Sequence, residues 1–454
     1  MGLIESIKAI YSMVFGFYEN IGSLVYTFYL VNSRIILDYI HLFFDNAFYV
    51  LLFLSIIITS LYATIGIYVF FNKKKIKKDY SVSDSELPFL TVQIPTYNEL
   101  AAINCARRCV NSDYPKEKYQ IIIGDDSSDK EVSKKIDEFA DQHKDLVLVT
   151  RRGSNAGFKP GNLNHMLNFT KGNYIVILDS DFLPEEDFLR RIVSPFIQDK
   201  TISAVQARWV MKNFSQNLVS IVGGVIPMFS HQIALPFLDM IGGTSFIAGS
   251  AEAIRKKDLL ELGGWREGSL TEDIEYSLRL TKSGKKIKYL SNLGCECESP
   301  FKLKDLCKQQ MRWAYGVITA IKLHFIGIIS NKKLQFKNVV NSLLLISGYA
   351  VTVLFFLLAV FGLMSIITHR PEVVNWGKFF SETSLNIALT SGFLLASILT
   401  LVLAKKTRQV PRMLVASFSV GIVVIYHITK GIFKAIFNRD MQWFMLTKHG
   451  NLIK

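Results

Sequence analysis

The sequence of 454 residues predicts an α/β domain, with a mainly parallel sheet and helices on both of its faces, inserted between transmembrane helices. Short apolar runs rich in β-branched residues alternate with helical patterns in the middle of the chain, which is typical of such a sheet. Long uncharged runs flank this part. Hydrophobic residues make up 50% of the chain and charged residues 20%, which is too apolar for an ordinary soluble protein and too charged for a membrane bundle alone.

Residues 174–178 are the expected central strand, because they are apolar and rich in β-branched side chains. Asp179, Ser180 and Asp181 come directly after it. Ligands of open α/β sheets bind beyond the carboxyl ends of the strands. Two carboxylates held this close favour a cation, and Mg²⁺ or Mn²⁺ is the expected one. The alternative is an Asp-rich turn that caps the next helix.

Three earlier strands are expected at residues 89–94, 119–123 and 146–150, each followed by a polar loop and a helix. The soluble domain that they begin is predicted to cover residues 79–302. Asp125 and Asp126 follow the second of these strands, at the same edge of the sheet as the acids after the central strand. They are either site residues or a pair that shapes the loop and caps the next helix.

The first membrane region is expected at residues 1–78. Residues 47–71 carry no formal charge and are long enough to cross a bilayer. The lysine-rich stretch 73–78 comes next, and by the positive-inside rule it places this end, and the soluble domain after it, in the cytoplasm. Residues 9–30 contain Glu19 and Asn20, so they form either a polar-spotted span or an interfacial helix.

A second membrane region is expected at residues 339–454, with spans at 339–368 and 385–404. Residues 413–437, which contain two lysines, form either an interface helix or a third span. An interface-helix region is predicted at 303–338.

Residues 220–246 are apolar but interrupted by Pro227, Pro236 and several glycines. We expect amphipathic segments lying against the membrane there, because these helix breakers argue against a clean span.

The net charge of +14 lies largely in the flanks of the apolar runs, so it indicates membrane orientation and contact with anionic lipids. No nucleic-acid-binding motif is visible, and no nucleic-acid partner is expected. The chain is therefore predicted to be an integral membrane protein. Its five cysteines lie in the part predicted to be cytoplasmic, where thiols stay reduced.

The acidic residues fit the transfer of a sugar from a nucleotide. Asp126 or Asp125 can accept a hydrogen bond from a base N–H, and Asp179 with Asp181 can hold the cation that neutralises a departing diphosphate. An attacking sugar hydroxyl must lose a proton, and Asp273 is the candidate base. It lies at the start of a predicted helix, where the helix amino terminus would favour its ionised form.

Basic and aromatic residues complete the set. Lys159 can pair with phosphate as a point charge, and Arg312 can bind it bidentately. Trp313 offers a flat surface for an acceptor sugar and shares a helix face with Gln309 and Arg312. Each feature has a second explanation. Lys159 could be an exposed loop lysine, Gln309 to Trp313 an interfacial helix with an aromatic anchor, and residues 269–273 a plain helix cap.

Between residues 89 and 316 the chain resembles the membrane-integrated family-2 glycosyltransferases, the group that includes cellulose, hyaluronan and mannan synthases. The stretches 206–209 and 263–265 are most similar to the mannan- and glucan-synthase-like branch. The motifs that carry the resemblance are Pro95-Thr96-Tyr97-Asn98-Glu99, Asp125-Asp126, Lys159-Pro160-Gly161-Asn162, Asp179-Ser180-Asp181, Phe246-Ile247-Ala248-Gly249-Ser250, Thr271-Glu272-Asp273 and Gln309-Gln310-Met311-Arg312-Trp313.

The resemblance implies a GT-A fold, a nucleotide-sugar donor, Mg²⁺ or Mn²⁺, inversion at the anomeric carbon, and Asp273 as general base. The donor-binding residues that it implies are Thr96, Tyr97, Glu99, Asp125, Asp126, Lys159, Asp179 and Arg312, with Asp179 and Asp181 as the metal ligands. The acceptor-binding residues that it implies are Gly249, Ser250, Glu272, Gln309 and Trp313.

A last motif lies in the tail, at residues 443–450. Phe444, Thr447, Lys448 and His449 resemble the gating-loop motif Phe-x-Val-Thr-x-Lys, which closes over bound donor. Leu446 replaces the Val, His449 stands where the Lys is expected, and Lys448 comes one place early. The motif therefore leaves open whether this loop contacts phosphate.

The predicted function is elongation of a β-linked polysaccharide by an inverting, metal-dependent membrane glycosyltransferase that uses a UDP- or GDP-sugar. One alternative is a non-processive enzyme that glycosylates a lipid acceptor, as ceramide glucosyltransferases do. The other is a membrane protein that only binds nucleotide, and the intact set of Asp126, Asp179, Asp181 and Asp273 argues against it. A homo-oligomer is compatible with all three.

Overall fold

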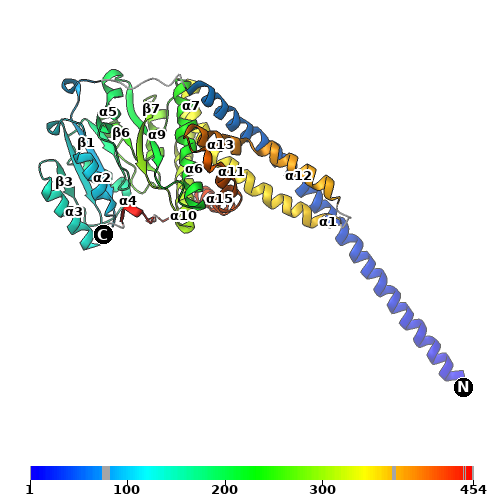
Figure 1. The fold of residues 1–454 in the computed structure, drawn as a ribbon. Coiled ribbons are helices and arrows are strands. Elements are labelled where there is room, and N and C mark those ends of the chain that lie inside the picture. Colours follow the sequence, from blue (N-terminus) through cyan, green and yellow to red (C-terminus); the bar gives the residue numbers. More distant parts are fainter. Residues whose placement is uncertain (1, 74–81, 371–374, 443, 445, 452–454) are drawn as a thin grey trace. The chain divides into compact units, whose positions relative to one another are not determined.

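The computed structural model describes residues 2–73, 82–370, 375–442, 444 and 446–451 (Figure 1). The chain divides into two compact units. The larger unit comprises residues 58–353 and 391–454 and contains the sheet, and the smaller one comprises residues 1–57 and 354–390 and is helical. The candidate site lies entirely within the larger unit.

A seven-stranded sheet with the order β3-β2-β1-β4-β6-β5-β7 forms the centre of the larger unit. The pairs β1–β2, β1–β4, β2–β3 and β5–β7 are parallel, and β6 is antiparallel to both β4 and β5. The strands are β1 (Leu90–Thr96), β2 (Tyr119–Asp125), β3 (Val147–Thr150), β4 (Tyr174–Ile177), β5 (Ile202–Met211), β6 (Glu252–Arg255) and β7 (Lys286–Cys297).

The α/β prediction is confirmed, and the four expected strands correspond to β1 to β4. The sheet is mixed because the short strand β6 inserts antiparallel between β4 and β5. Four residues give too little alternation to reveal such a strand in the sequence.

Helices cover both faces of the sheet (Figure 1). Ile121 and Ile123 of β2 belong to a core that also contains residues of α2, α3 and α5, whereas Ile122 between them belongs to a core with residues of α4, α8 and α9. This alternation follows from the period of two along a strand. The helices are α2 (Ala101–Val110), α3 (Lys130–Gln142), α4 (Phe158–Leu167), α5 (Phe188–Gln198), α8 (Lys256–Glu261) and α9 (Glu272–Lys282).

Residues 218–240 form a nearly continuous helical run, which corrects the expectation of broken amphipathic segments. It consists of α6 (Leu218–Phe229), a π turn η4 (Ser230–Ala234) and α7 (Leu235–Met240). The wider π turn lies between the two prolines, and Pro236 falls in the first turn of α7, where the missing N–H is tolerated. The run is mostly buried and packs against α13 (Gly392–Leu403) and α14 (Val410–Phe418).

α10 (Leu303–Ile329) packs closely against α15 (Val420–Ile436) beside the sheet domain (Figure 1). A Cβ on Gly431 would lie 2.4 Å from the carbonyl oxygen of Met311, so only glycine allows this approach. Lys322 donates to the carbonyl oxygens of Ala435 (2.9 Å) and Ile436 (3.1 Å) at the end of α15. The predicted helix 413–437 thus corresponds to α14 (Val410–Phe418) and α15, which are bent by 55° at their break.

Four described helices are long and apolar enough to cross a membrane, and up to six if each bent helix pair is counted as one span. The predicted segments 9–30 and 47–71 lie on one uninterrupted helix, α1 (Gly2–Asn72). The predicted span 339–368 lies within α11 (Phe336–Thr368). The predicted span 385–404 is divided at Ser391 between α12 (Trp376–Thr390) and α13 (Gly392–Leu403).

The smaller unit is built from parts of α1, α11 and α12. A polar cluster holds α1 to α11 within it. His41 Nδ1 lies 3.0 Å from the carbonyl oxygen of Ser365, and the Ser365 hydroxyl donates to Asp45 at 3.1 Å. Arg370 forms an ion pair with Asp38 at 2.5 Å.

Candidate active site

A cavity of about 190 Å³ opens beyond the carboxyl ends of β1, β2 and β4. Helix α10, the start of α9 and the tail form its other walls. The predicted site residues that line it are Thr96, Tyr97, Glu99, Asp126, Lys159, Asp179, Asp181, Gly249, Glu272, Asp273, Gln309, Arg312, Trp313, Phe444, Thr447 and Lys448. Asp125, Ser250 and His449, which were predicted with them, lie behind or beside the lining.

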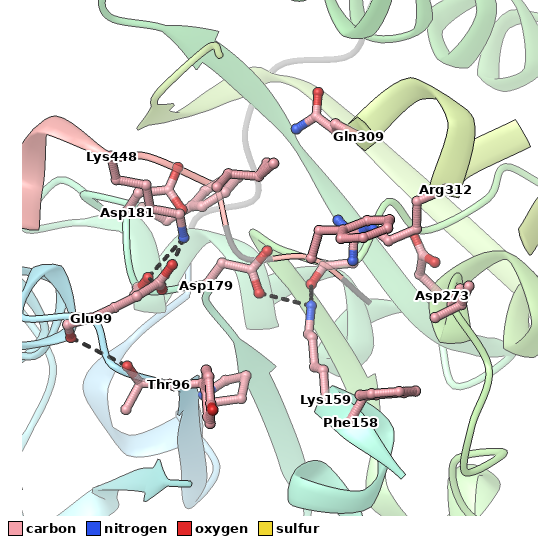
Figure 2. Close-up of a pocket in the computed structure, with 18 of the residues that line it drawn as sticks. Thr96, Glu99, Phe158, Lys159, Asp179, Asp181, Asp273, Gln309, Arg312 and Lys448 are labelled. Atoms are coloured by element: carbon pink, nitrogen blue, oxygen red, sulfur yellow. Dashed lines mark hydrogen bonds and ion pairs between the residues drawn. The ribbon is translucent and has the colours of Figure 1, made fainter. Parts of the chain in front are cut away.

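Lys159, in the first turn of α4, bridges two carboxylates of the cavity (Figure 2). Its Nζ lies 2.7 Å from Asp179 Oδ1 and 3.1 Å from Glu272 Oε1, and it donates to the carbonyl oxygen of Gly249 at 2.5 Å. Although burial opposes the charged form, Asp179 and Glu272 raise the pKa of Lys159. All three ammonium hydrogens have acceptors, so Lys159 acts as a fixed positive link between these acids.

Lys448 of the tail makes a second such contact, at the other carboxylate of the acidic pair (Figure 2). Its Nζ lies 2.7 Å from Asp181 Oδ1, 3.0 Å from Glu99 Oε2 and 2.9 Å from the hydroxyl of Ser180. The Ser180 hydroxyl in turn donates to Glu99. Lys448, which stands one place before the lysine position of the gating-loop motif, is therefore the residue that reaches the acidic pair.

Asp179 and Asp181 fit a divalent cation that is also held by substrate phosphates. Both carboxylates face the cavity, and neither caps α5, which begins after Asp187. Among the described residues, no group of three His, Cys, Asp or Glu side chains could hold a metal ion by itself. Mg²⁺ and Mn²⁺ accept such an incomplete protein shell, because diphosphate oxygens and water supply the remaining ligands.

Asp126 lines the cavity and is oriented by a single arginine. Arg152 donates from Nε to Asp126 Oδ1 (3.0 Å) and from Nη2 to Oδ2 (2.6 Å). The same guanidinium donates to the carbonyl oxygens of Ala156 (2.6 Å) and Phe158 (3.1 Å), which fixes the loop before α4. The pair presents an oriented, acceptor-only carboxylate to the cavity, which suits recognition of a base N–H.

Asp125 has a structural environment instead. It is buried and accepts from the backbone N–H of Ser127 (3.0 Å), the hydroxyl of Ser133 (2.7 Å) and Nε of Arg151 (2.8 Å). Burial opposes ionisation, but these hydrogen bonds outweigh it and lower the pKa of Asp125. Of the two predicted donor-binding acids at the end of β2, only Asp126 lines the cavity, because successive side chains alternate in direction along an extended chain.

Asp273 lies in the first turn of α9 and faces the cavity. Burial and the neighbouring Glu272 raise the pKa of Asp273 to about 7, against the opposing charge of Lys159. Backbone N–H groups at the helix start do favour the ionised form, as the sequence indicates, but loss of solvent is the larger effect and raises the pKa of Asp273. A Cβ on Gly249, which has φ +88°, would lie 3.2 Å from Asp273 Oδ2, so the glycine leaves room beside the carboxylate.

The start of α9 is not a plain helix cap. Thr271 is the N-cap residue, and its side chain makes no cap hydrogen bond. Glu272 is turned toward Lys159 instead of completing a capping box with Ser269. At this helix start the side chains of Glu272 and Asp273 therefore line the cavity.

α10 supplies Gln309, Arg312 and Trp313 to the cavity from one face, as their spacing predicts. The helix can approach α9 closely because Gly316 lies against Thr271, whose Cγ2 would be 2.5 Å from a Cβ at position 316. The charge of Arg312 lies within electrostatic range of Glu272 and Asp179. This face is part of the cavity wall, in contrast to the interfacial-anchor alternative.

Three further residues shape the loop 246–250 and were missed in the sequence. Gln206 accepts from the backbone N–H of Ala248 (2.7 Å) and donates to the carbonyl oxygen of Ser250 (3.0 Å), to which Trp209 Nε1 also donates at 3.0 Å. Glu252 accepts from the backbone N–H of Gly249 at 2.8 Å, and burial raises the pKa of Glu252 well above its usual range. The stretch 206–209 carried a family resemblance but no chemical signal.

The tail is held at the mouth of the cavity by a fourth residue that the sequence did not indicate. Glu298 accepts from the backbone N–H groups of His449 (2.7 Å) and Gly450 (3.0 Å). The His449 ring stacks on Phe301, with the ring centroids 4.1 Å apart. His449 thus points away from the cavity and anchors the tail from outside.

Comparison with known proteins shows that the chain is similar to glycosyltransferases. The profile described as "Glycosyltransferase like family 2" matches residues 88–316, half of the chain. "Probable glucomannan 4-beta-mannosyltransferase 10" of Arabidopsis thaliana is 27% identical over 404 residues, which cover 83% of this chain and 68% of that protein. "Glucomannan 4-beta-mannosyltransferase 2" of the same plant is 27% identical over 338 residues, 70% of this chain and 62% of that protein. The chain thus spans about two thirds of the length of these relatives.

A solved structure shares the fold. The mannosyltransferase PcManGT of Pyrobaculum calidifontis, determined in complex with GDP-Man and Mn²⁺, superposes with a TM-score of 0.55 and 18% sequence identity. The match covers 79% of this chain and 99% of that chain. The expected GT-A-like fold is therefore confirmed, and the profile match shows that this chain belongs to the glycosyltransferase-like family 2.

Proposed function

We propose that this protein is an inverting membrane glycosyltransferase that elongates a β-linked glycan from a nucleotide-sugar donor. The observation that carries the proposal is the common cavity of Asp273 and the Asp179–Asp181 pair, with the pKa of Asp273 raised to about 7. A base whose pKa lies near the working pH is partly ionised and still binds a proton well. GDP-mannose is the first donor to test, because it is the sugar nucleotide bound by PcManGT.

In the proposed reaction Asp273 removes the proton from a hydroxyl of the acceptor sugar. The hydroxyl oxygen forms a bond to the anomeric carbon from the side opposite the leaving group, and the bond from this carbon to the diphosphate oxygen breaks. A single displacement of this kind inverts the anomeric configuration. The nucleoside diphosphate leaves, and the proton stays on Asp273 until solvent accepts it.

Negative charge on the leaving diphosphate must be offset. Asp179 and Asp181 would hold Mg²⁺ or Mn²⁺, which supplies this neutralisation when bound. Arg312 lines the same cavity and can donate two parallel hydrogen bonds to a phosphate. Lys159 contributes indirectly, since its ammonium group is committed to Asp179 and Glu272 and holds them in place.

A glycan acceptor is favoured over a lipid by two features. Trp313 and Trp209 both line the cavity, and aromatic faces suit the apolar faces of sugar rings. The curated relatives are named for glucomannan mannosyltransferase activity. Product analysis tests the first alternative, in which the acceptor is a lipid.

In this proposal the sheet domain lies on the cytoplasmic side of the membrane, where nucleotide sugars are available. The lysine-rich stretch 73–78 after the apolar part of α1 supports this orientation. The described helices that are long and apolar enough to cross a bilayer are consistent with an integral membrane protein surrounded by lipid.

The test uses the purified full chain in lipid nanodiscs, with GDP-mannose, GDP-glucose, UDP-glucose and UDP-N-acetylglucosamine in turn, and with Mg²⁺ or Mn²⁺. Nucleotide release and product size are both scored, and linkage is read from digestion by a β-mannanase or β-glucanase. A single-sugar lipid product would favour the lipid-acceptor alternative. If the parent protein released no nucleotide from any of these donors, and so did not differ from Asp273→Asn, the proposal would be overturned.

A further inference from the structure

We propose that Lys448 is an intramolecular substitute for the divalent cation at Asp181, so that docking of the tail and binding of the cation exclude each other. The tail is defined here as Phe444 and residues 446–451. The inference rests on the proposed function, because the cation belongs to that reaction. It adds a regulatory step, in which the tail must release Asp181 before the cation can bind.

The first support is that Lys448 uses its whole donor capacity at this position. Its three ammonium hydrogens have three acceptors, namely Asp181 Oδ1 (2.7 Å), Glu99 Oε2 (3.0 Å) and the Ser180 hydroxyl (2.9 Å). The side chains of Lys448, Asp181 and Glu99 are only 16%, 10% and 10% exposed. Charges this far from solvent are weakly screened, so the ammonium group satisfies the two acids as a cation would.

The second support is that both oxygens of Asp181 are occupied when the tail is docked, one by the tail and the other by the backbone near the end of β7. Oδ1 binds Lys448, and Oδ2 accepts from the backbone N–H of Glu298 at 3.2 Å. A divalent ion on Asp181 would lie next to the ammonium group, and two positive charges at that separation repel strongly in a poorly solvated site. The ion and Lys448 therefore compete for the carboxylate.

The third support is that the tail has its own docking contacts, which hold the lysine in place. Thr447 donates its backbone N–H to Asp305 at 3.1 Å, and Glu298 accepts from the backbone N–H groups of His449 and Gly450. A Cβ on Gly450 would lie 2.9 Å from Cβ of Ala101 on α2, so the docked tail fits closely against the sheet domain. Docking is thus a defined state with several independent contacts.

Linkage between docking and cation binding has two consequences. If only the undocked state binds the cation, the apparent dissociation constant is raised by the inverse of the undocked fraction, so a tail docked nine tenths of the time raises it about tenfold. By reciprocity the cation must lower the docked fraction, which falls from nine tenths toward zero as the cation saturates the undocked state. Both can be measured without turnover.

The first experiment measures Mn²⁺ binding to the full chain in nanodiscs without nucleotide, from the electron paramagnetic resonance signal of free Mn²⁺. Lys448→Met should bind Mn²⁺ about tenfold more tightly than the parent protein. Lys212→Met is the matched control, because it also removes one lysine charge but from a partly exposed pair with Glu296, and it should leave the affinity unchanged.

Equal affinity in Lys448→Met and the parent would overturn the competition while leaving the metal site intact. Binding by neither protein, also when the measurement is repeated with GDP to complete the ligand shell, would overturn the metal site itself, and the inference with it. The two failures are therefore distinguishable.

The second experiment measures hydrogen exchange of the tail amides as Mn²⁺ is added. Exchange at His449 and Gly450 should speed up in the parent protein, because the cation displaces Lys448 and the docking contacts at Glu298 loosen. Glu298→Gln weakens those contacts without changing the Asp181 side chain, so it should also tighten Mn²⁺ binding. Slower exchange of these amides on adding Mn²⁺ would contradict the proposal, since the cation would then stabilise the docked tail.

Discussion

Nε2 of His324 on α10 lies 2.8 Å from Oε1 of Glu275 on α9. The Glu275 carboxylate also accepts two hydrogen bonds from Arg279, which in turn donates to the carbonyl oxygens of Leu262 and Gly264. One buried acid thus joins the helix that carries Asp273 to the helix that carries Arg312 and Trp313. The position of Asp273, the candidate base, relative to Trp313, the proposed acceptor-binding residue, depends on this junction.

His324→Leu should therefore lower the thermal unfolding midpoint by several degrees. The change leaves one side of a buried carboxylate unpaired, which costs about 1–3 kcal/mol. His324→Gln, which restores an N–H donor, should recover part of the loss. His427→Leu is the control, since the exposed His427 ring hydrogen-bonds to the carbonyl oxygen of Val423 on its own helix. An unchanged midpoint in His324→Leu would contradict the role of the junction.

The activity should rise with pH and level off above about pH 7, because Asp273 must be ionised to accept a proton and its pKa is raised to about 7. Asp273→Asn should lose roughly 10²–10⁴ in transfer at all pH values while donor binding persists. The measurement is kcat/KM between pH 5.5 and 9, with donor affinity by calorimetry.

A stability measurement provides the control for this assignment. A carboxyl whose folded pKa is raised stabilises the folded protein at pH values below its unfolded pKa, and that contribution is lost as the pH rises through about 7. The stability of Asp273→Asn relative to the parent should therefore increase as the pH is raised from 4 to 8. Loss of donor binding in Asp273→Asn would instead place Asp273 in the donor pocket, with Glu272 as the next candidate base.

Asp125→Asn and Asp126→Asn should differ in kind although the residues are adjacent. Asp125 holds Arg151, Ser127 and Ser133, so its variant should lower stability by about 1–3 kcal/mol and leave the donor KM near that of the parent. Asp126→Asn should raise the donor KM roughly 10- to 100-fold, the effect of a charge-assisted hydrogen bond. Unfolding midpoints and donor titrations separate them, and matching profiles in both assays would refute the distinction.

Asp179→Asn and Asp181→Asn should each remove metal-dependent transfer while the protein still folds. The physical reason is that each variant removes one of the two carboxylates that would hold the cation beside the diphosphate. Activity is measured against Mn²⁺ and Mg²⁺ concentration, with Asp187→Asn as control, because Asp187 pairs with Arg191 on the surface of α5. Near-normal turnover of either variant at saturating metal would disprove the metal-site assignment.

Residues 88–331, residues 405–408 and the chain after Arg439 should face the cytoplasm, and residues 370–384 the outside. The five native cysteines are all buried, so cysteines introduced at Ser384 and Asn451 can be labelled in intact cells against a low background. Labelling is expected at position 384 alone. Labelling at position 451 from outside would make residues 413–437 a complete span and would separate the tail from a cytoplasmic cavity.

The sequence predicts much of this fold because its signals are local. The β-branched runs correspond to β1 to β4, with acids at the ends of β2 and β4, and the spacing of Gln309, Arg312 and Trp313 sets them on one helix face. The strand β6 and the run α6–η4–α7 could not be predicted in the same way. β6 is only four residues long, and the effect of Pro227 and Pro236 was overridden by a π turn and by packing against α13 and α14.

The site shows the same division. Apart from Asp125 and Ser250, the predicted site residues in the compact motifs of the sheet domain line the cavity as expected, whereas their partners come from distant parts of the chain. Nothing in the local sequence links Arg152 to Asp126, Glu298 to His449 or Lys448 to Asp181, because these contacts depend on tertiary approach. The expected helix-terminus effect on Asp273 is present but outweighed for a related reason, since burial is a property of the folded cavity and not of the helix.

Lys159 lies in the cavity but cannot react as a free amine. Its raised pKa and its three acceptors keep the nitrogen lone pair protonated at any physiological pH, so the side chain is neither a nucleophile nor a target for acetylation or amine-reactive labels. Schiff-base chemistry with the open-chain form of a sugar is closed to it for the same reason. The role of Lys159 is therefore confined to its positive charge, which holds Asp179 and Glu272 together.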